Sequence, residues 1–331
     1  QGIRREDVFQ VCVVGNTCMH HLFLGISPAS LVHAPYTPAV SERLVLNAGD
    51  YGLAVQERAE LIMLSDIAGY VGADTCGCLL AIRQDQQEEI SLMIDIGTNG
   101  EMVLGNRERM VTCSTAAGPA FEGAKIECGM RGAAGAVDHV KYEDGKWNYT
   151  TVGNKPAVGL CGSGLIDLVA GLLDAGMLDE NGVLRSGQEK QGVFILVPPE
   201  RGGNERGVYL TQKDLGEVQL AKAAIAAGIQ MLMERLGITE DDICSVYIAG
   251  AFGNYMDPVS AGKIGLLPAT LVKKVKPVGN AAGEGAKIAL VNEKEMLEMD
   301  ELVRKIEFVE LAASADFQDH FIDELGFETG E

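Results

Sequence analysis

The sequence is poor in aromatic and in basic residues. Aromatic residues make up 5% of the 331-residue chain, with a single tryptophan, whereas glycine occurs 41 times. That balance disfavours an aromatic-rich β-sandwich and favours an α/β fold with many tight turns. Lys and Arg total 27 against 47 Asp and Glu, a formal net charge of −20. This charge argues against nucleic acid and anionic membranes as partners, but backbone amides and Mg²⁺ still allow a phosphate ligand.

Long apolar runs and clustered cysteines are also missing. No apolar stretch reaches the roughly 20 residues of a membrane-spanning helix, and no signal-peptide pattern is present, so we expect a cytoplasmic protein. The eight cysteines lack the spacing of an iron–sulfur centre. The pair Cys76-x-Cys78 does not suit a shared metal, because positions i and i+2 of a helix face apart. We therefore expect free thiols and no iron–sulfur cluster within this chain.

Strand-like and helix-like segments alternate along the chain, which favours a mostly parallel or mixed sheet covered by helices. The longest predicted helix begins at Thr211, with Asp214 as a capping-box-like partner, and ends near Leu236 before Gly237. The length suffices for two domains or for two lobes that share a cleft. Two polar, Gly- and Pro-rich stretches are expected to be irregular surface connections: residues 27–55 and 180–206.

The most informative motif is the heptapeptide DIGTNGE at 95–101, which directly follows an apolar run. It predicts a buried strand, a tight polar hairpin and a further strand. Asp95 at the strand end can hold a hydrated Mg²⁺. Gly97 lets a phosphate approach the backbone, and Thr98 and Asn99 offer it donors. Because the motif is short, it indicates a phosphate site only together with the glycine turns that recur elsewhere in the chain.

Four further glycine turns follow apolar segments: VVGNT at 13–17, VGLCGSGLID at 158–167, YIAGAFGNY at 247–255 and VGNAAGEGA at 278–286. Each places glycine where the backbone can approach a ligand, and several lead into a helix whose N-terminus carries free N–H groups. A single turn of this kind often only closes the chain, but five around one cleft predict a nucleotide site. Their spacing matches neither a P-loop nor a dinucleotide-binding fingerprint.

The chain resembles the C-terminal ATPase region of reductive activators of corrinoid-dependent proteins, within the acetate and sugar kinase, Hsp70 and actin (ASKHA) superfamily. The resemblance runs from about residue 13 to residue 290. The following stretches carry it: VVGNTCMHHLFLGISP, SDIAGYVGADT, LMIDIGTNGEMVLGN, TCSTAAGPAFEGAKIECGM, GLCGSGLIDLVAGLL, YIAGAFGNYMDP, and IGLLP followed by VGNAAGEGA.

This resemblance implies an α/β protein with two ribonuclease-H-like lobes around a nucleotide cleft, the actin-like ATPase fold. Residues 1–88 would be the remainder of an incomplete first lobe with a connecting helix, and residues 89–331 the second lobe. The resemblance also implies an upstream segment with another DIGT-type hairpin and an N-terminal [2Fe–2S] domain, both outside this sequence. Because the chain starts at Gln1 and a core-like strand follows soon after, we expect further residues upstream.

The resemblance implies that ATP hydrolysis drives an uphill electron transfer that restores an inactive Co(II) corrinoid to Co(I). ATP and Mg²⁺ are the implied cofactors. The implied partner is a corrinoid protein, the cobalamin-binding component of a methyl-transfer system, and the implied oligomeric state is a homodimer.

The family's motifs assign candidate roles. Asp95 would orient Mg²⁺ through water, and Glu101 and Glu122 are candidates to position the attacking water, although each would equally suit an ordinary surface or capping position. The candidate nucleotide-binding residues lie in the glycine turns: Gly97, Thr98 and Asn99 at the phosphates; Gly162, Ser163 and Gly164 at a helix start; Gly250, Ala251, Phe252 and Gly253 in the adenosine motif; and Gly279, Asn280, Gly283 and Glu284 on the adenosine side or in a hinge helix.

His20 and His21 lie side by side in an apolar, helix-like run. Imidazole is a good ligand for metals such as cobalt, but the apolar surroundings favour packing of at least one of the two rings against the core.

Three functions stay open from the sequence. The favoured one is an ATPase module that acts on a corrinoid protein. The second is a small-molecule kinase of the same superfamily, which would need a basic or polar pocket for the phosphoryl acceptor; the motifs show no Lys/Arg cluster. The third is a non-catalytic dimerisation or docking domain for a corrinoid protein.

Overall fold

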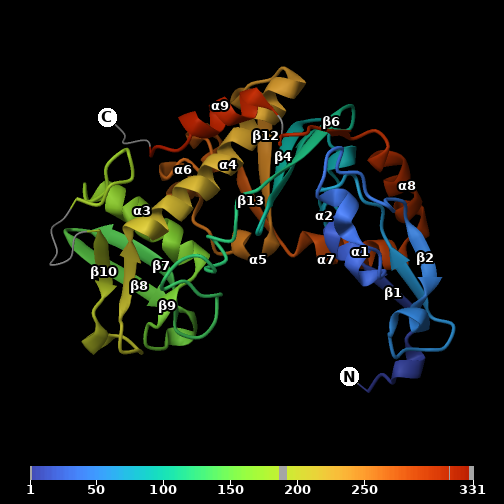
Figure 1. The fold of residues 1–331 in the computed structure, drawn as a ribbon, viewed down its shortest axis with the longest axis horizontal. Helices are drawn as coiled ribbons and strands as arrows, with labels where there is room; N and C mark the ends of the chain where they lie inside the picture. Colours follow the sequence, from blue (N-terminus) through green and yellow to red (C-terminus); the bar gives the residue numbers. More distant parts are fainter. Residues whose placement is uncertain (1, 186–191, 313, 328–331) are drawn as a thin grey trace.

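The computed structural model describes residues 2–185, 192–312 and 314–327. A central sheet separates two outer parts (Figure 1). The N-terminal part lies on one side, and a part built around strands β7–β11 lies on the other. No helix in the described ranges has both the length and the apolar character required to cross a membrane.

The central sheet has six strands and is mixed, as the alternating pattern predicted. β4, β5 and β6 form an antiparallel meander. β12 pairs parallel with β4, β13 with β12, and the short β14 with β6. Across the sheet the order is β13 (Val275–Gly279), β12 (Ile243–Ala249), β4 (Ile90–Ile96), β5 (Gly100–Gly105), β6 (Met110–Thr115) and β14 (Glu307–Phe308).

Helices cover both faces of this sheet. Leu92 and Ile94 of β4 belong to the larger core, which includes α4 (Gln212–Leu236), and α9 (Ala315–Asp323) packs on α4. Met93 points to the other face, because side chains alternate along a strand, and it packs with the second core. The helices of that second core are α2 (Ala73–Ile82), α7 (Ala281–Val291) and α8 (Glu293–Val303).

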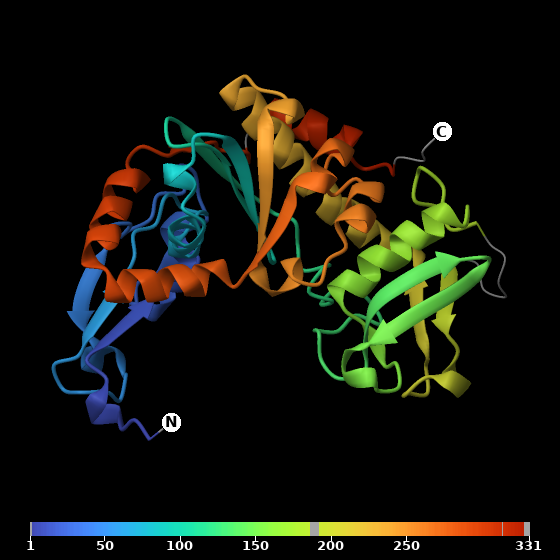
Figure 2. The ribbon, with the colours of Figure 1, turned by 180° about the vertical axis from the view of Figure 1, so that it is seen from behind.

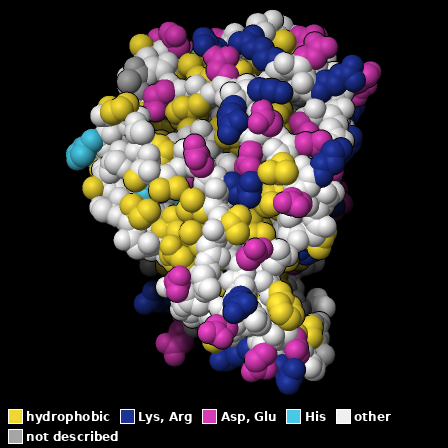
Figure 3. All heavy atoms as spheres, turned by 90° about the vertical axis from the view of Figure 1, so that its right-hand side faces the viewer, with side chains coloured by type: hydrophobic (Ala, Val, Ile, Leu, Met, Phe, Trp, Pro, Cys, Tyr) yellow, Lys and Arg dark blue, Asp and Glu magenta, His cyan; other side chains and the backbone are white. Residues whose placement is uncertain are grey.

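The N-terminal part is a three-stranded sheet with one helix beside it. β1 (Gln10–Val13) pairs parallel with β3 (Glu60–Met63), which pairs antiparallel with β2 (Leu44–Asn47); α1 spans Thr17–Phe23. The prediction of an irregular segment at 27–55 was therefore wrong at β2, because this short outer strand gains its order from pairing with β3. On this side of the molecule apolar side chains gather among interspersed acidic and basic ones (Figure 3).

The opposite part carries two small sheets. β7 (Ala136–Glu143) pairs with β8 (Lys146–Thr151) and with β9 (Gly159–Leu160), and α3 (Gly162–Asp174) packs on β7. β10 (Val193–Val197) and β11 (Val208–Thr211) form an antiparallel pair. The prediction of an irregular surface segment at 180–206 missed β10, and residues 186–191 of that segment lie outside the described residues.

The predicted ends of the longest helix are confirmed. The Thr211 side chain accepts a hydrogen bond from the Asp214 N–H at 3.2 Å, and Asp214 Oδ2 accepts one from the Thr211 N–H at 2.9 Å. Gly237 follows α4 with a φ of 70°, in the left-handed region that glycine adopts without strain. α4 packs against β5 and β6 of the central sheet and also against β11 and α9. It therefore connects the central sheet with the part built around β7–β11.

Candidate functional site

The DIGTNGE hairpin brings two of the predicted motifs together. Asp95, near the end of β4, lies opposite Glu101 in β5 and opposite Ala249 in β12. Gly250 begins the short helix α5 (Gly250–Gly253) with a φ of 88°, and a Cβ there would lie 2.9 Å from Asp95 Oδ1. Glycine at this position therefore lets the adenosine motif pass directly beside the Asp95 carboxylate.

A third carboxylate joins Asp95 and Glu101. Asp74, in the first turn of α2, interacts electrostatically with both. Burial and the charge of Asp74 raise the pKa of Asp95 to about 6, against a weaker opposite effect of the Cys78 thiol, whose Sγ lies 3.9 Å from Asp95 Oδ2. Burial, Asp74 and Asp95 raise the pKa of Glu101 to about 8. Buried carboxylates that repel one another make a site for a cation or for a shared proton.

The sequence did not single out Asp74. The signal was available in VGADT, which places an acidic residue two positions after a glycine at the start of a predicted helix. It could not be connected to the hairpin from sequence, because only the packing of α2 beside β4 brings the two together.

The turn of the hairpin contacts the loop that carries Glu122. The Thr98 hydroxyl donates to both Glu122 carboxylate oxygens at 3.2 Å, and the Gly97 N–H donates to the Asn99 carbonyl oxygen at 2.9 Å. The Asn99 side chain hydrogen-bonds Glu101. The structure therefore places Glu122 at the hairpin, on its exposed side, and Glu101 on its buried side.

A pocket of about 630 Å³ opens beside the hairpin. It is bounded by the end of β4, the loop at 121–132, the β7–β8 sheet, the start of α3 and the segment after α5. Gly162 and Ser163 line it, whereas Gly164 packs on β7, where a Cβ would lie 2.2 Å from the Val137 carbonyl oxygen. Two of the three predicted residues at the α3 start thus face the pocket, and the third has a packing role.

The adenosine motif turns back sharply on its own strand. A Cβ on Gly253 would lie 2.6 Å from Ile248 Cγ2, so this glycine permits the close return. Tyr255, just beyond, lines the pocket. The side chains of Ala251 and Phe252 lie outside what the structure describes.

The last glycine turn lies next to α5. Gly279 has a φ of 60°, and a Cβ there would lie 3.1 Å from Asn254 Nδ2. Asn280 caps α7, because its side-chain oxygen accepts a hydrogen bond from the Gly283 N–H at 3.0 Å. Glu284 lies on the exposed side of α7 and pairs with Lys287 at 2.5 Å. This turn therefore adjoins the adenosine motif, while Glu284 points to solvent.

Both neighbouring histidines are buried, which confirms the packing expected from sequence. His21 Nδ1 donates to the Thr17 carbonyl oxygen at 2.8 Å, since Nε2 accepts from the Ala39 N–H at 2.9 Å and so carries no proton. His20 Nδ1 lies 3.2 Å from the Asp66 carboxylate. Asp66 Oδ1 also accepts from the Ala73 N–H at 2.9 Å, so the His20–Asp66 pair supports the first turn of α2, beside Asp74.

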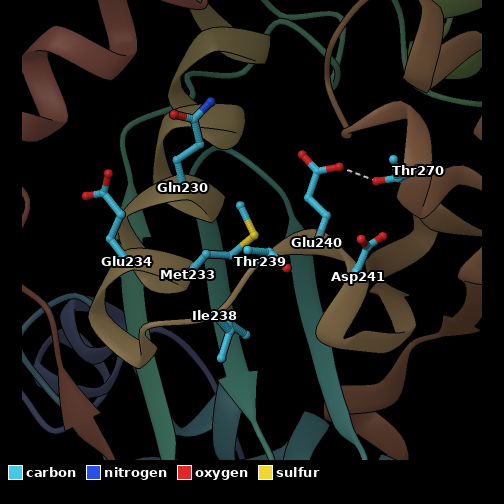
Figure 4. A pocket seen from close by; sticks show the side chains of 8 residues that line it. All are labelled: Gln230, Met233, Glu234, Ile238, Thr239, Glu240, Asp241 and Thr270. Carbon is cyan, nitrogen blue, oxygen red and sulfur yellow. Dashed lines mark hydrogen bonds between the residues drawn. The ribbon is translucent and has the colours of Figure 1, made fainter.

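A second pocket, of about 450 Å³, lies far from this cluster (Figure 4). It is lined by the end of α4 and by the turn that precedes β12, where the Thr270 hydroxyl donates to Glu240. Asp95 lies beside Ala249, at the other end of β12. This pocket is therefore not part of the candidate site.

Comparisons with known proteins identify the family and the fold of the chain. A family model described as the C-terminal domain of RACo, the ASKHA domain, matches residues 89–331, and one described as the RACo middle region matches residues 1–87. A solved structure titled reductive activator for corrinoid, iron–sulfur protein matches with a TM-score of 0.91 and 38% identity, over 98% of this chain and 54% of that one.

Two curated relatives extend the comparison. The corrinoid activation enzyme RamQ of Eubacterium limosum is 36% identical over 336 residues, covering 97% of this chain and 56% of the relative. The [Co(II) methylated amine-specific corrinoid protein] reductase of Methanosarcina barkeri is 29% identical over 303 residues, covering 84% of this chain and 54% of the relative. The chain thus spans about half the length of the curated relatives it matches. It belongs to the family of the RACo C-terminal ASKHA domain and has that domain's actin-like ATPase fold.

Proposed function

We propose that this chain is the ATP-binding and ATP-hydrolysing part of a cytoplasmic reductive activator, which couples hydrolysis to reduction of a corrinoid protein from Co(II) to Co(I). The observation that carries the proposal is the convergence of Asp95, Glu101 and Gly250 beside a pocket of nucleotide size. The names of the relatives support corrinoid activation as the purpose.

The nucleotide phosphates would lie where the hairpin backbone of Gly97, Thr98 and Asn99 adjoins the pocket, with the nucleoside toward the adenosine motif. Asp95 fits a hydrated Mg²⁺, because its buried carboxylate faces other carboxylates and gains from a nearby cation. Among the described residues no group of three or more His, Cys, Asp or Glu side chains is arranged to hold a metal. Such an ion would therefore keep most of its water, as Mg²⁺ does in phosphate sites. When bound, it would neutralise charge on the phosphoryl oxygens.

The protein's own contribution would be positioning. Glu101, which stays protonated near neutral pH because its pKa is about 8, would hold the hairpin through its hydrogen bond with the Asn99 side chain rather than act as a base. Glu122, on the exposed side of the turn, would orient a water molecule near the phosphates, and its hydrogen bonds with the Thr98 hydroxyl support this role. Phosphoryl transfer needs little more than such positioning and charge stabilisation.

The remaining parts of the activity would come from outside this chain. We propose that a [2Fe–2S] domain elsewhere in the full protein supplies the electron and that the working form is a homodimer. We also propose that residues 1–88 are the remainder of a first lobe with its connecting helix, and residues 89–331 the second lobe. The separate three-stranded sheet of the N-terminal part supports this division.

The direct test is calorimetric titration of the chain with Mg-ATP, beside Asp95→Ala and the control Asp319→Ala. Asp319 is exposed on α9, away from the site. We expect the wild type and the control to bind and the Asp95 variant to lose at least about tenfold in affinity, the size expected when a charged contact is removed. Absence of binding by the wild type would contradict a nucleotide site in this chain and favour a docking domain.

A second measurement separates the enzyme classes. We expect ATP hydrolysis to rise when a Co(II) corrinoid protein is added, because the proposed activity couples the two. Phosphorylation of a sugar or carboxylate, without any effect of corrinoid protein, would instead identify a small-molecule kinase.

A further inference from the structure

The loop at 121–132 is hydrogen-bonded to β9, beside the pocket. The Met130 N–H donates to the Leu160 carbonyl oxygen at 2.8 Å, and the Leu160 N–H donates to the Cys128 carbonyl oxygen at 2.8 Å. A Cβ on Gly129 would lie 2.2 Å from the Gly123 carbonyl oxygen, so the loop also folds tightly on itself. These contacts fix the backbone of Arg131 beside the end of β9, immediately before the first turn of α3.

Arg131 differs in charge from the other ionisable groups of this pocket. Among its described lining residues Arg131 is the one Lys or Arg, whereas Glu122 and Asp138 are acidic. Its side chain is exposed and makes no hydrogen bond or ion pair within the described ranges. The guanidinium therefore keeps all of its donors for a ligand, and its planar fork matches the oxygens of a phosphate.

We propose that Arg131 binds the phosphate chain of the nucleotide and is the main side-chain cation of the site. The proposal rests on the nucleotide-binding function argued above. A polyanionic ligand beside Asp74, Asp95 and Glu101 meets negative charge from α2 and the hairpin. Arg131 lines the pocket beside the hairpin together with Gly162 and Ser163, at the start of α3, where the first N–H groups of the helix have no intrahelical partner. The positive charge of Arg131 would offset this repulsion.

The test compares ligands that differ only in phosphate. Wild type, Arg131→Met and Arg131→Lys are titrated with adenosine, Mg-ADP and Mg-ATP. We expect Arg131→Met to weaken Mg-ATP binding by about tenfold or more, the loss typical of a charge-assisted hydrogen bond, and to leave adenosine binding unchanged. Arg131→Lys restores part of the loss, because it keeps the charge without the fork. Arg206→Met, an exposed arginine outside the pocket, serves as the control.

The outcomes separate this inference from the function on which it rests. If the wild type binds no nucleotide, the proposed function itself fails. If the wild type binds and Arg131→Met binds Mg-ATP equally well, the role of Arg131 is overturned. An equal loss for adenosine and Mg-ATP also overturns it, because the arginine would then shape the pocket rather than bind phosphate. Thermal unfolding of each variant shows whether the fold is kept.

Discussion

Glu101 shows how a single residue links the site to the stability of the protein. Its pKa rises from an ordinary 4.5 to about 8, through burial first and then through the charges of Asp74 and Asp95. Between these two values the folded protein holds a proton that the unfolded chain has already released. The free energy of unfolding therefore falls as the pH rises through this window. Asp95, with a pKa of about 6, acts in the same direction.

Glu101→Gln should remove most of this pH dependence, since the amide keeps the shape and one donor but has no charge to bury. We expect the difference between the two midpoints of thermal unfolding, Glu101→Gln minus wild type, to grow as the pH rises from about 5 to about 9. Thermal unfolding at several pH values without Mg²⁺ measures this directly. Glu108→Gln, on an exposed turn, is the control. If the unfolding midpoints of the wild type and Glu101→Gln change with pH in parallel, the raised pKa of Glu101 is contradicted.

The sequence predicted those residues of the candidate site that lie within one short segment. DIGTNGE placed Asp95 and Glu101 at a strand end and across a hairpin, as the register of β4 and β5 confirms. Asp74, Asp66 and Arg131 were not found. Asp74, with Asp66 near it, lies close to the hairpin only because α2 packs beside β4, and Arg131 lines the pocket because its loop is hydrogen-bonded to Leu160. Such contacts between distant segments leave no local pattern in the sequence.

At the scale of elements, the closest packing in the second core is the crossing of α2 and α7. A Cβ on Gly285 would lie 1.8 Å from the Gly77 carbonyl oxygen, and a Cβ on Gly77 would lie 2.6 Å from the Ala282 carbonyl oxygen. In Figure 2 the orange-red α7 extends from the foot of the central sheet across the blue N-terminal part. The two glycines therefore let the backbones touch at the junction of the two parts.

Gly285→Ala should separate these helices. Because the obstacle is backbone, which cannot move aside as a flexible side chain can, we expect a loss of about 1–3 kcal/mol in the free energy of unfolding, the usual cost of overpacking. Gly216→Ala in α4 is the matched control: nothing lies within 4 Å of its Cβ position, and alanine there should stabilise the helix by about 0.5–1 kcal/mol. Urea unfolding measures the free energy of unfolding of both variants. An equal change in this free energy for Gly285→Ala and Gly216→Ala would contradict the close contact of α2 and α7.

Prediction of the elements succeeded where local chemistry fixes them. The capping box and Gly237 determined both ends of α4, and the polar turn after β4 determined the first hairpin. β2 and β10 were missed for a common reason. Each is short and lies in a Gly/Pro-rich surface stretch, and each is ordered by its pairing, β2 with β3 and β10 with β11.

At the scale of the whole molecule, the two matched regions share one core rather than meeting at a polar boundary. Ile62 and Leu79, from the N-terminal part, pack in the same cluster as Met93, Val103 and Ala249 of the central sheet. Buried apolar area of this kind contributes roughly 25 cal/mol per Å² to folding.

It follows that the C-terminal region should not be a stable unit when separated. In a chain limited to residues 89–331, Met93, Val103 and the buried side of α7 would face water. We expect a lower midpoint of thermal unfolding than for residues 1–331, and binding of a dye that recognises exposed apolar surface. A chain that lacks only residues 1–7, none of which is buried among those described, should unfold as the whole chain does. Equal unfolding midpoints for all three chains would show that the shared core adds nothing to the stability of the C-terminal region, and that the proposed lobes fold independently.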